Sequence, residues 1–134
     1  MTKLLEIEGI GPVYAEKLQG VGVQSVEALL ERGATPQGRQ ELAELTGLGN
    51  ARILEWVNHA DLFRIKGVGE EYSDLLEAAG VDTVPELAQR NPGNLFAKLQ
   101  EVNAEKKIVR RVPPLASIES WIEQAKQLPR VIQY

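Results

Sequence analysis

The stretch Ile7-Glu8-Gly9-Ile10-Gly11 recurs later in the chain as Ile65-Lys66-Gly67-Val68-Gly69, at an offset of 58 residues. A fixed order of residue types at a fixed period indicates an internal duplication. The match continues beyond the glycines, with Tyr14 and Tyr72, Leu18 and Leu76, Gly22-Val23 and Gly80-Val81, Ser25 and Thr83, and Leu29 and Leu87. We therefore expect two units of the same design, residues 1–60 and residues 61–134.

The offset changes toward the end of each copy. There the matching residues are Ile53, Trp56, Val57 and Ala60 in the first copy and Ile118, Trp121, Ile122 and Ala125 in the second, at an offset of 65 residues. The second copy therefore contains about seven extra residues, and we expect an insertion near residues 103–114. Within each copy the four matching residues fall at i, i+3, i+4 and i+7, which is the spacing of one apolar helix face. Each tryptophan is accordingly expected in a core, with Tyr14 and Tyr72 packing beside it.

Glycine, proline and capping residues divide each copy into short helices. Pro12 suits the first turn of a helix that ends near Gly20, because proline has no N–H to leave unpaired there. Ser25 and Thr35-Pro36 are typical helix starts, and Asn50 is expected to cap the last helix of the copy. In the second copy the corresponding starts are Thr83 and Asn91-Pro92. The one β-branched stretch, residues 107–112, precedes two prolines and is expected to be an extended loop. The prediction is an all-α fold of two tandem five-helix units.

Composition limits the classes of protein to which this chain belongs. It has 134 residues, no cysteine and a net charge of −4. Disulfides and cysteine–metal sites are therefore excluded, and no apolar run is long enough for a membrane helix or a signal peptide. We expect a cytoplasmic protein. The charge is uneven, because residues 101–134 contain six Lys/Arg against four Asp/Glu while the preceding segments are acidic.

Three Gly-apolar-Gly triplets stand between expected helices: Gly9-Ile10-Gly11, Gly47-Leu48-Gly49 and Gly67-Val68-Gly69. We call them the first, second and third glycine turns. The middle residue is expected to point into the core. The glycines have no Cβ, so the backbone can adopt positive φ and lie open at the surface. The N–H groups of the following helix then face outward, where they and the helix dipole favour an anion such as phosphate.

This architecture resembles the helix-hairpin-helix superfamily. The whole chain also resembles a family of small uncharacterised bacterial proteins with tandem units, on the stretches 33–39, 56–62 and 67–72. The superfamily members that bind DNA contact phosphate through hairpin backbone amides without reading sequence, and some hairpins hold a monovalent cation. Carried over, the resemblance implies contacts at all three glycine turns, namely at Gly9, Ile10, Gly11, Gly47, Leu48, Gly49, Gly67, Val68 and Gly69.

The turns differ in their charged neighbours. Glu8 precedes the first turn, and Glu70 and Glu71 follow the third, where a phosphate would sit. The second turn is followed by Asn50 and Arg52 with no adjacent acid, so both residues join the expected interface. The position matching the second turn in the second copy has no glycine and contains Arg111-Val112-Pro113-Pro114, which we call the fourth turn. Tight inter-helix turns without a ligand remain the alternative for the first and third.

A basic cluster lies in the insertion. Lys106, Lys107, Arg110 and Arg111 place four cations within six residues, which we call the basic loop. Such a cluster attracts phosphate or an acidic partner, although a solvated loop would have the same composition.

Catalytic groups are absent from this pattern. His59, the only histidine, lies near Asp61, but no nucleophile or oxyanion donor accompanies them. No acidic cluster has metal-ligand spacing, and the triplets lack the Lys-Ser/Thr of a nucleotide-binding loop. We therefore expect no enzyme activity, no cofactor, no metal and no small-molecule substrate. The leading hypothesis is weak, sequence-independent contact with the phosphate backbone of nucleic acid, DNA in the first instance. The alternative is a protein–protein adaptor with acidic helix faces.

Overall fold

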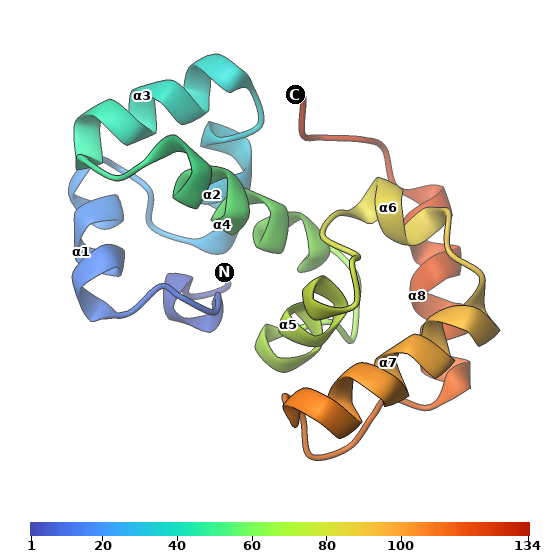
Figure 1. Ribbon diagram of the computed structural model, residues 1–134. Helices are drawn as coiled ribbons and strands as arrows, with labels where there is room; N and C mark the ends of the chain where they lie inside the picture. Colours follow the sequence, from blue (N-terminus) through green and yellow to red (C-terminus); the bar gives the residue numbers. More distant parts are fainter. The chain divides into compact units, whose positions relative to one another are not determined.

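The computed structural model describes residues 1–134 and is entirely helical (Figure 1). Its elements in chain order are the 3-10 turn η1 (Leu4–Glu6) and the helices α1 (Pro12–Gly20), α2 (Val26–Arg32), α3 (Pro36–Thr46), α4 (Asn50–Leu62), α5 (Glu70–Ala78), α6 (Val84–Ala88), α7 (Pro92–Lys106) and α8 (Leu115–Gln127). The all-α prediction is confirmed. None of these helices combines the length and apolar composition that crossing a lipid bilayer requires.

The chain divides into two units. Unit 1 contains residues 1–61 together with residues 131–134, and unit 2 contains residues 62–130. The second unit was expected to run to residue 134, but the last four residues pack with the first unit instead.

Proline and capping side chains set the helix starts. α1, α3 and α7 each begin at a proline. Ser25, Thr35 and Asn91 accept hydrogen bonds from backbone N–H groups three residues ahead, which satisfies donors that a helix start leaves open. Two residues that were expected to cap a helix, Asn50 and Thr83, do not do so through their side chains in the structure. Asn50 is the first residue of α4, whose first bond runs from the Ile53 N–H to the Gly49 carbonyl, and the Thr83 side chain accepts no capping bond.

Equivalent aromatic pairs lie in the two units. Trp56 and Trp121 are buried, as expected, with Tyr14 beside the first and Tyr72 beside the second. The ring centroids are 5.3 Å apart in both pairs, and the rings are inclined at 52° and 50°. Through these pairs α1 packs on α4 in unit 1, and α5 packs on α8 in unit 2.

The core of unit 2 is aliphatic around its tryptophan. α8 packs against α6 and α7, and α5 packs against α7. The core also includes Val109, from the connection between α7 and α8, with Ile108 and Val112 packed against it.

The extra residues of the second copy are distributed over two places. α7 has 15 residues where α3 has 11, and residues 107–114 connect α7 to α8 where three residues connect α3 to α4. The insertion therefore lengthens a helix as well as a loop.

A buried arginine holds the end of the chain against unit 1. Arg39 is only 5% exposed, and its guanidinium donates to the carbonyls of Gly33 and Gln133, each at 2.8 Å. It also lies over the Tyr134 ring, 5.8 Å from the centroid. The Gln133 N–H donates to the Ala34 carbonyl at 2.7 Å. Residues 131–134 thus form a strap on unit 1, which the sequence did not suggest.

Candidate nucleic-acid interface

The first glycine of each turn has a conformation that other residues rarely adopt. The φ angles are +95° at Gly9, +74° at Gly47 and +97° at Gly67. Gly9 and Gly67 also lie against the tryptophan of their unit. A Cβ would be 3.3 Å from Nε1 of Trp56 at Gly9, and 2.9 Å from Nε1 of Trp121 at Gly67. The fold itself requires glycine at these two positions.

The second glycine of each turn has no such requirement. Gly11 and Gly69 have φ angles of −87° and −118°, in the extended region, and each precedes the first residue of a helix. A Cβ built on Gly11, Gly49 or Gly69 meets no atom within 4 Å. Ser, Asp or Asn would cap the following helix better. Glycine here leaves the start of α1, α4 and α5 uncovered.

The middle residues anchor the turns to different extents. Ile10 and Val68 are buried, as expected. Leu48 was expected to point into the core but is only half-buried. The second turn is held by a polar contact instead, because the Thr46 hydroxyl donates to the Leu42 carbonyl and accepts from the Leu48 N–H.

Arg52 connects the two helices that follow the glycine turns of unit 1. Its guanidinium donates to the Tyr14 hydroxyl and lies 5.0 Å from the Tyr14 ring centroid. Arg52 and Asn50 are both exposed. In unit 2 the position of Arg52 corresponds to Ser117, so Tyr72 has no equivalent cation. The expected basic side chain therefore sits between the starts of α1 and α4, held in place by an aromatic ring.

Acidic side chains lie beside two of the turns. Glu8, Glu70 and Glu71 are all exposed, and the last two occupy the first turn of α5, where they stabilise the helix dipole. They also oppose the approach of phosphate. No acidic residue occurs from 45 to 54, so the second turn has no acidic neighbour in the sequence comparable to Glu8 or Glu70.

The backbone of the basic loop is anchored by a side chain of α7. Both ends of the Asn103 side-chain amide bond to Val109: its NH2 donates to the Val109 carbonyl at 3.0 Å, and its oxygen accepts from the Val109 N–H at 2.9 Å. Val109 is 6% exposed. Lys106 ends α7, and Lys107 has a φ of 52°, the only non-glycine residue with positive φ. The four cations of the basic loop are exposed on this fixed backbone.

The structure brings the basic loop next to the helix of the third turn. An open hollow of about 520 Å³ is lined by Glu71 of α5 and by Asn103, Lys107, Ile108, Val109 and Arg110. In the sequence the third turn and the basic loop are separate features. The role of Asn103 could not be expected either, because nothing in the residue pattern signals that its amide bonds to a residue six positions ahead.

The fourth turn offers no counterpart to the glycine turns. Pro114 precedes α8, and its carbonyl accepts from the N–H groups of Ser117 and Ile118. Pro113 and Pro114 have no N–H to donate. The side chain of Arg111 is exposed at this turn and could contact an anion.

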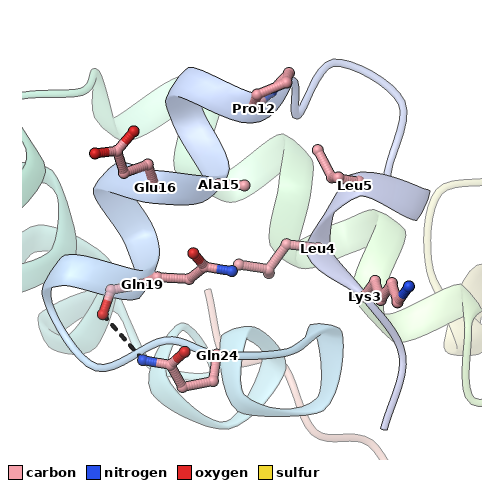
Figure 2. Close-up of a pocket in the computed structure, with 8 residues that line it drawn as sticks. All are labelled: Lys3, Leu4, Leu5, Pro12, Ala15, Glu16, Gln19 and Gln24. Carbon is pink, nitrogen blue, oxygen red and sulfur yellow. Dashed lines mark hydrogen bonds between the residues drawn. The ribbon is translucent and has the colours of Figure 1, made fainter.

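A second hollow, of about 550 Å³, lies in unit 1 between η1 and α1. Figure 2 shows its lining residues, which are Lys3, Leu4, Leu5, Pro12, Ala15, Glu16, Gln19 and Gln24. Leu5 is 48% exposed at its edge. The Gln24 side chain donates to the Gln19 carbonyl and closes one end. The hollow combines an apolar wall with a polar rim.

His59 and Asp61 are buried, at 2% and 1% exposed. They do not lie at the surface beside a glycine turn.

Residues 8–128 match a family described as Domain of unknown function (DUF4332). The chain belongs to this family. The match begins just before the first glycine turn and ends after α8, so the DUF4332 region covers both tryptophan pairs and the basic loop. The expected relationship to an uncharacterised family is confirmed. No curated protein and no solved structure matches the chain significantly.

Proposed function

We propose that this protein is a cytoplasmic, non-enzymatic binding module of tandem helix-hairpin-helix units that contacts nucleic-acid phosphates without reading sequence. The observation that supports this most is the second glycine of each turn. Gly11, Gly49 and Gly69 are glycine without positive φ and without any crowding that excludes a Cβ. A bare backbone at the start of a helix lets a phosphate oxygen approach the amides closely.

The second turn fits this role best. It precedes α4, the 13-residue helix that carries Arg52, and no acidic residue adjoins it in the sequence. The first turn lies on the other side of the Arg52–Tyr14 contact, so one cation serves both helix starts of unit 1. In unit 2 the anchored cations of the basic loop supply the attraction that the glutamates of α5 oppose.

The net charge of −4 implies weak, salt-sensitive binding. Each neutralised phosphate adds about 0.7–0.9 to the log–log slope of affinity against salt. With about four phosphates contacted, affinity falls roughly 50- to 150-fold between ~50 and ~200 mM salt. A slope near zero, or no binding to duplex, single-stranded or branched DNA at low salt, contradicts the proposal.

Two substitutions test the interface by position. Gly49→Glu places a carboxylate in open space at the start of α4, and Arg110→Glu reverses one charge of the basic loop. We expect each to weaken binding about 10-fold or more while thermal unfolding is unchanged. Gln37→Glu is the charge-matched control for Gly49→Glu, because it adds the same negative charge at an exposed position of α3 outside the glycine turns. If Gly49→Glu and Arg110→Glu both bind as the control does, the interface is wrongly placed.

The second candidate function is a protein–protein adaptor. It is favoured by the acidic net charge and by the hollow beside η1, where Leu5 is 48% exposed. A peptide or helix with an apolar side chain and basic flanks would suit this surface. A stable protein partner whose binding is lost in Leu5→Ser and kept in Gly49→Glu would support the adaptor over the nucleic-acid module.

A further inference from the structure

The hollow beside the basic loop combines two cations with one carboxylate. Lys107 and Arg110 line it from the loop, and Glu71 lines it from the first turn of α5. Asn103 also lines it, but both ends of its amide are engaged by Val109. Three charged side chains, all exposed, are therefore left to meet a ligand. Ile108 adds an apolar surface, and about 520 Å³ is enough for one nucleotide of a strand.

The two cations and the carboxylate bind different groups of a ligand. Lys107 and Arg110 donate, and a phosphate accepts from them. The Glu71 carboxylate only accepts, so a ligand with a donor close to its phosphate would match all three charged side chains. The sugar–phosphate backbone of DNA contains no hydrogen-bond donor. The backbone of RNA has one at every nucleotide, the ribose 2′-hydroxyl.

We infer that the hollow lined by Glu71, Lys107 and Arg110 binds a single RNA strand, with Glu71 accepting a hydrogen bond from a ribose 2′-hydroxyl. This inference rests on the proposed function and names the nucleic acid. Glu71 then has opposite effects on the two polymers. Its charge weakens the attraction for any phosphate, and for RNA alone the hydrogen bond compensates for this loss.

The first unit provides an internal comparison. The positions that match Glu70 and Glu71 at the repeat offset are Pro12 and Val13, and Val13 is 66% exposed. The first turn of α1 therefore has no carboxylate at the position of Glu71. Selectivity for RNA belongs to unit 2, while the glycine turns of unit 1 treat RNA and DNA alike.

The test compares three single-stranded probes of one sequence: RNA, DNA and 2′-O-methyl RNA, which keeps the ribose oxygen but has lost the donor. At low salt we expect the wild-type chain to bind RNA about 10-fold more tightly than either other probe, the factor for one charge-assisted hydrogen bond. Glu71→Ala brings the three affinities together. Glu71→Gln tightens binding to all three and keeps part of the preference, because an amide oxygen still accepts.

Glu70→Ala is the matched control. It removes the same charge one residue away, and Glu70 does not line the hollow. We expect it to tighten binding to all probes by one common factor and to leave the RNA preference intact. If Glu71→Ala behaves as Glu70→Ala does, or if 2′-O-methyl RNA binds as tightly as RNA, the inference is overturned and the proposed function stands. If no probe binds at low salt, the proposed function itself fails.

Discussion

Alanine substitution is expected to destabilise the fold at Gly67 of the third turn and to leave its stability nearly unchanged at Gly69 of the same turn. Alanine at Gly67 must adopt a φ near +97°, which costs about 1–2 kcal/mol for a residue with a Cβ. That Cβ would also lie 2.9 Å from Nε1 of the buried Trp121, and moving a packed ring adds about 1 kcal/mol or more. Gly67→Ala is therefore expected to lower the free energy of unfolding by about 2–4 kcal/mol.

Alanine at Gly69 meets neither obstacle. Its φ of −118° is ordinary, and its Cβ would have no neighbour within 4 Å. Alanine is a poorer helix cap than glycine by about 0.5–1 kcal/mol, but it restricts the unfolded chain and recovers about 0.4–1 kcal/mol. We expect a net change within about 0.5 kcal/mol, together with weaker nucleic-acid binding because the amides are partly covered.

Urea unfolding of both variants measures the difference in their free energies of unfolding. Nucleic-acid binding by Gly69→Ala across a salt series measures the contribution of the third turn to binding. At this chain length 1 kcal/mol corresponds to a shift of about 4 °C in Tm. Equal losses of stability in the two variants would refute the assignment of a structural role to one glycine and an open surface to the other. Unchanged binding in a fully folded Gly69→Ala would remove the main support for phosphate contact at that turn.

Two further predictions concern single side chains. Lys107→Gly relieves the positive φ at the end of α7, so it should raise the free energy of unfolding by about 0.5–1 kcal/mol while weakening nucleic-acid binding. Lys106→Gln removes the same charge without the backbone effect and should weaken binding alone. A loss of stability in Lys107→Gly would contradict this prediction. Partial burial alone would raise the pKa of Glu27, but hydrogen bonds from the Thr2 N–H and hydroxyl and from the Glu27 N–H outweigh it, so the pKa is lowered. The ionised carboxylate therefore stabilises the fold at neutral pH, and this contribution disappears as pH falls through the lowered pKa. Unfolding across the acidic range should show Glu27→Gln less stable than wild type at neutral pH and equal to it at low pH, and a constant difference between them would rule out this linkage.

Local signals in the sequence were sufficient to predict most helix starts. Pro12, Pro36 and Pro92 fix φ and need no N–H, and Ser25 and Asn91 accept from the helix that they precede. The tryptophan–tyrosine pairs followed from the repeat, because equivalent residues on equivalent helices meet in the same way. Asn50 was expected to precede its helix as a cap, but it is the first residue of α4 and Gly49 precedes it. Glycine and asparagine both occur before helices, and the sequence does not show which of them does so here.

The contacts that shape the candidate site could not be predicted in this way. Asn103 bonds to Val109 only because α7 ends where it does, and Glu71 meets the basic loop only because α5 packs on α7. Arg39 contacts the carbonyl of Gln133, 94 residues away. Such pairings depend on the path of the whole chain, whereas capping and periodicity depend on a few neighbouring residues.

The strap of residues 131–134 has a consequence for the order in which the protein matures during synthesis. Unit 2 is continuous in the chain and lies between the two segments of unit 1. Although residues 1–61 leave the ribosome first, the Arg39 guanidinium keeps one donor without its Gln133 acceptor until the strap has been made. The unit that is translated first is therefore the one that is completed last. A fragment cut at the repeat boundary would hold every glycine turn of unit 1 and still lack the buried Ile132.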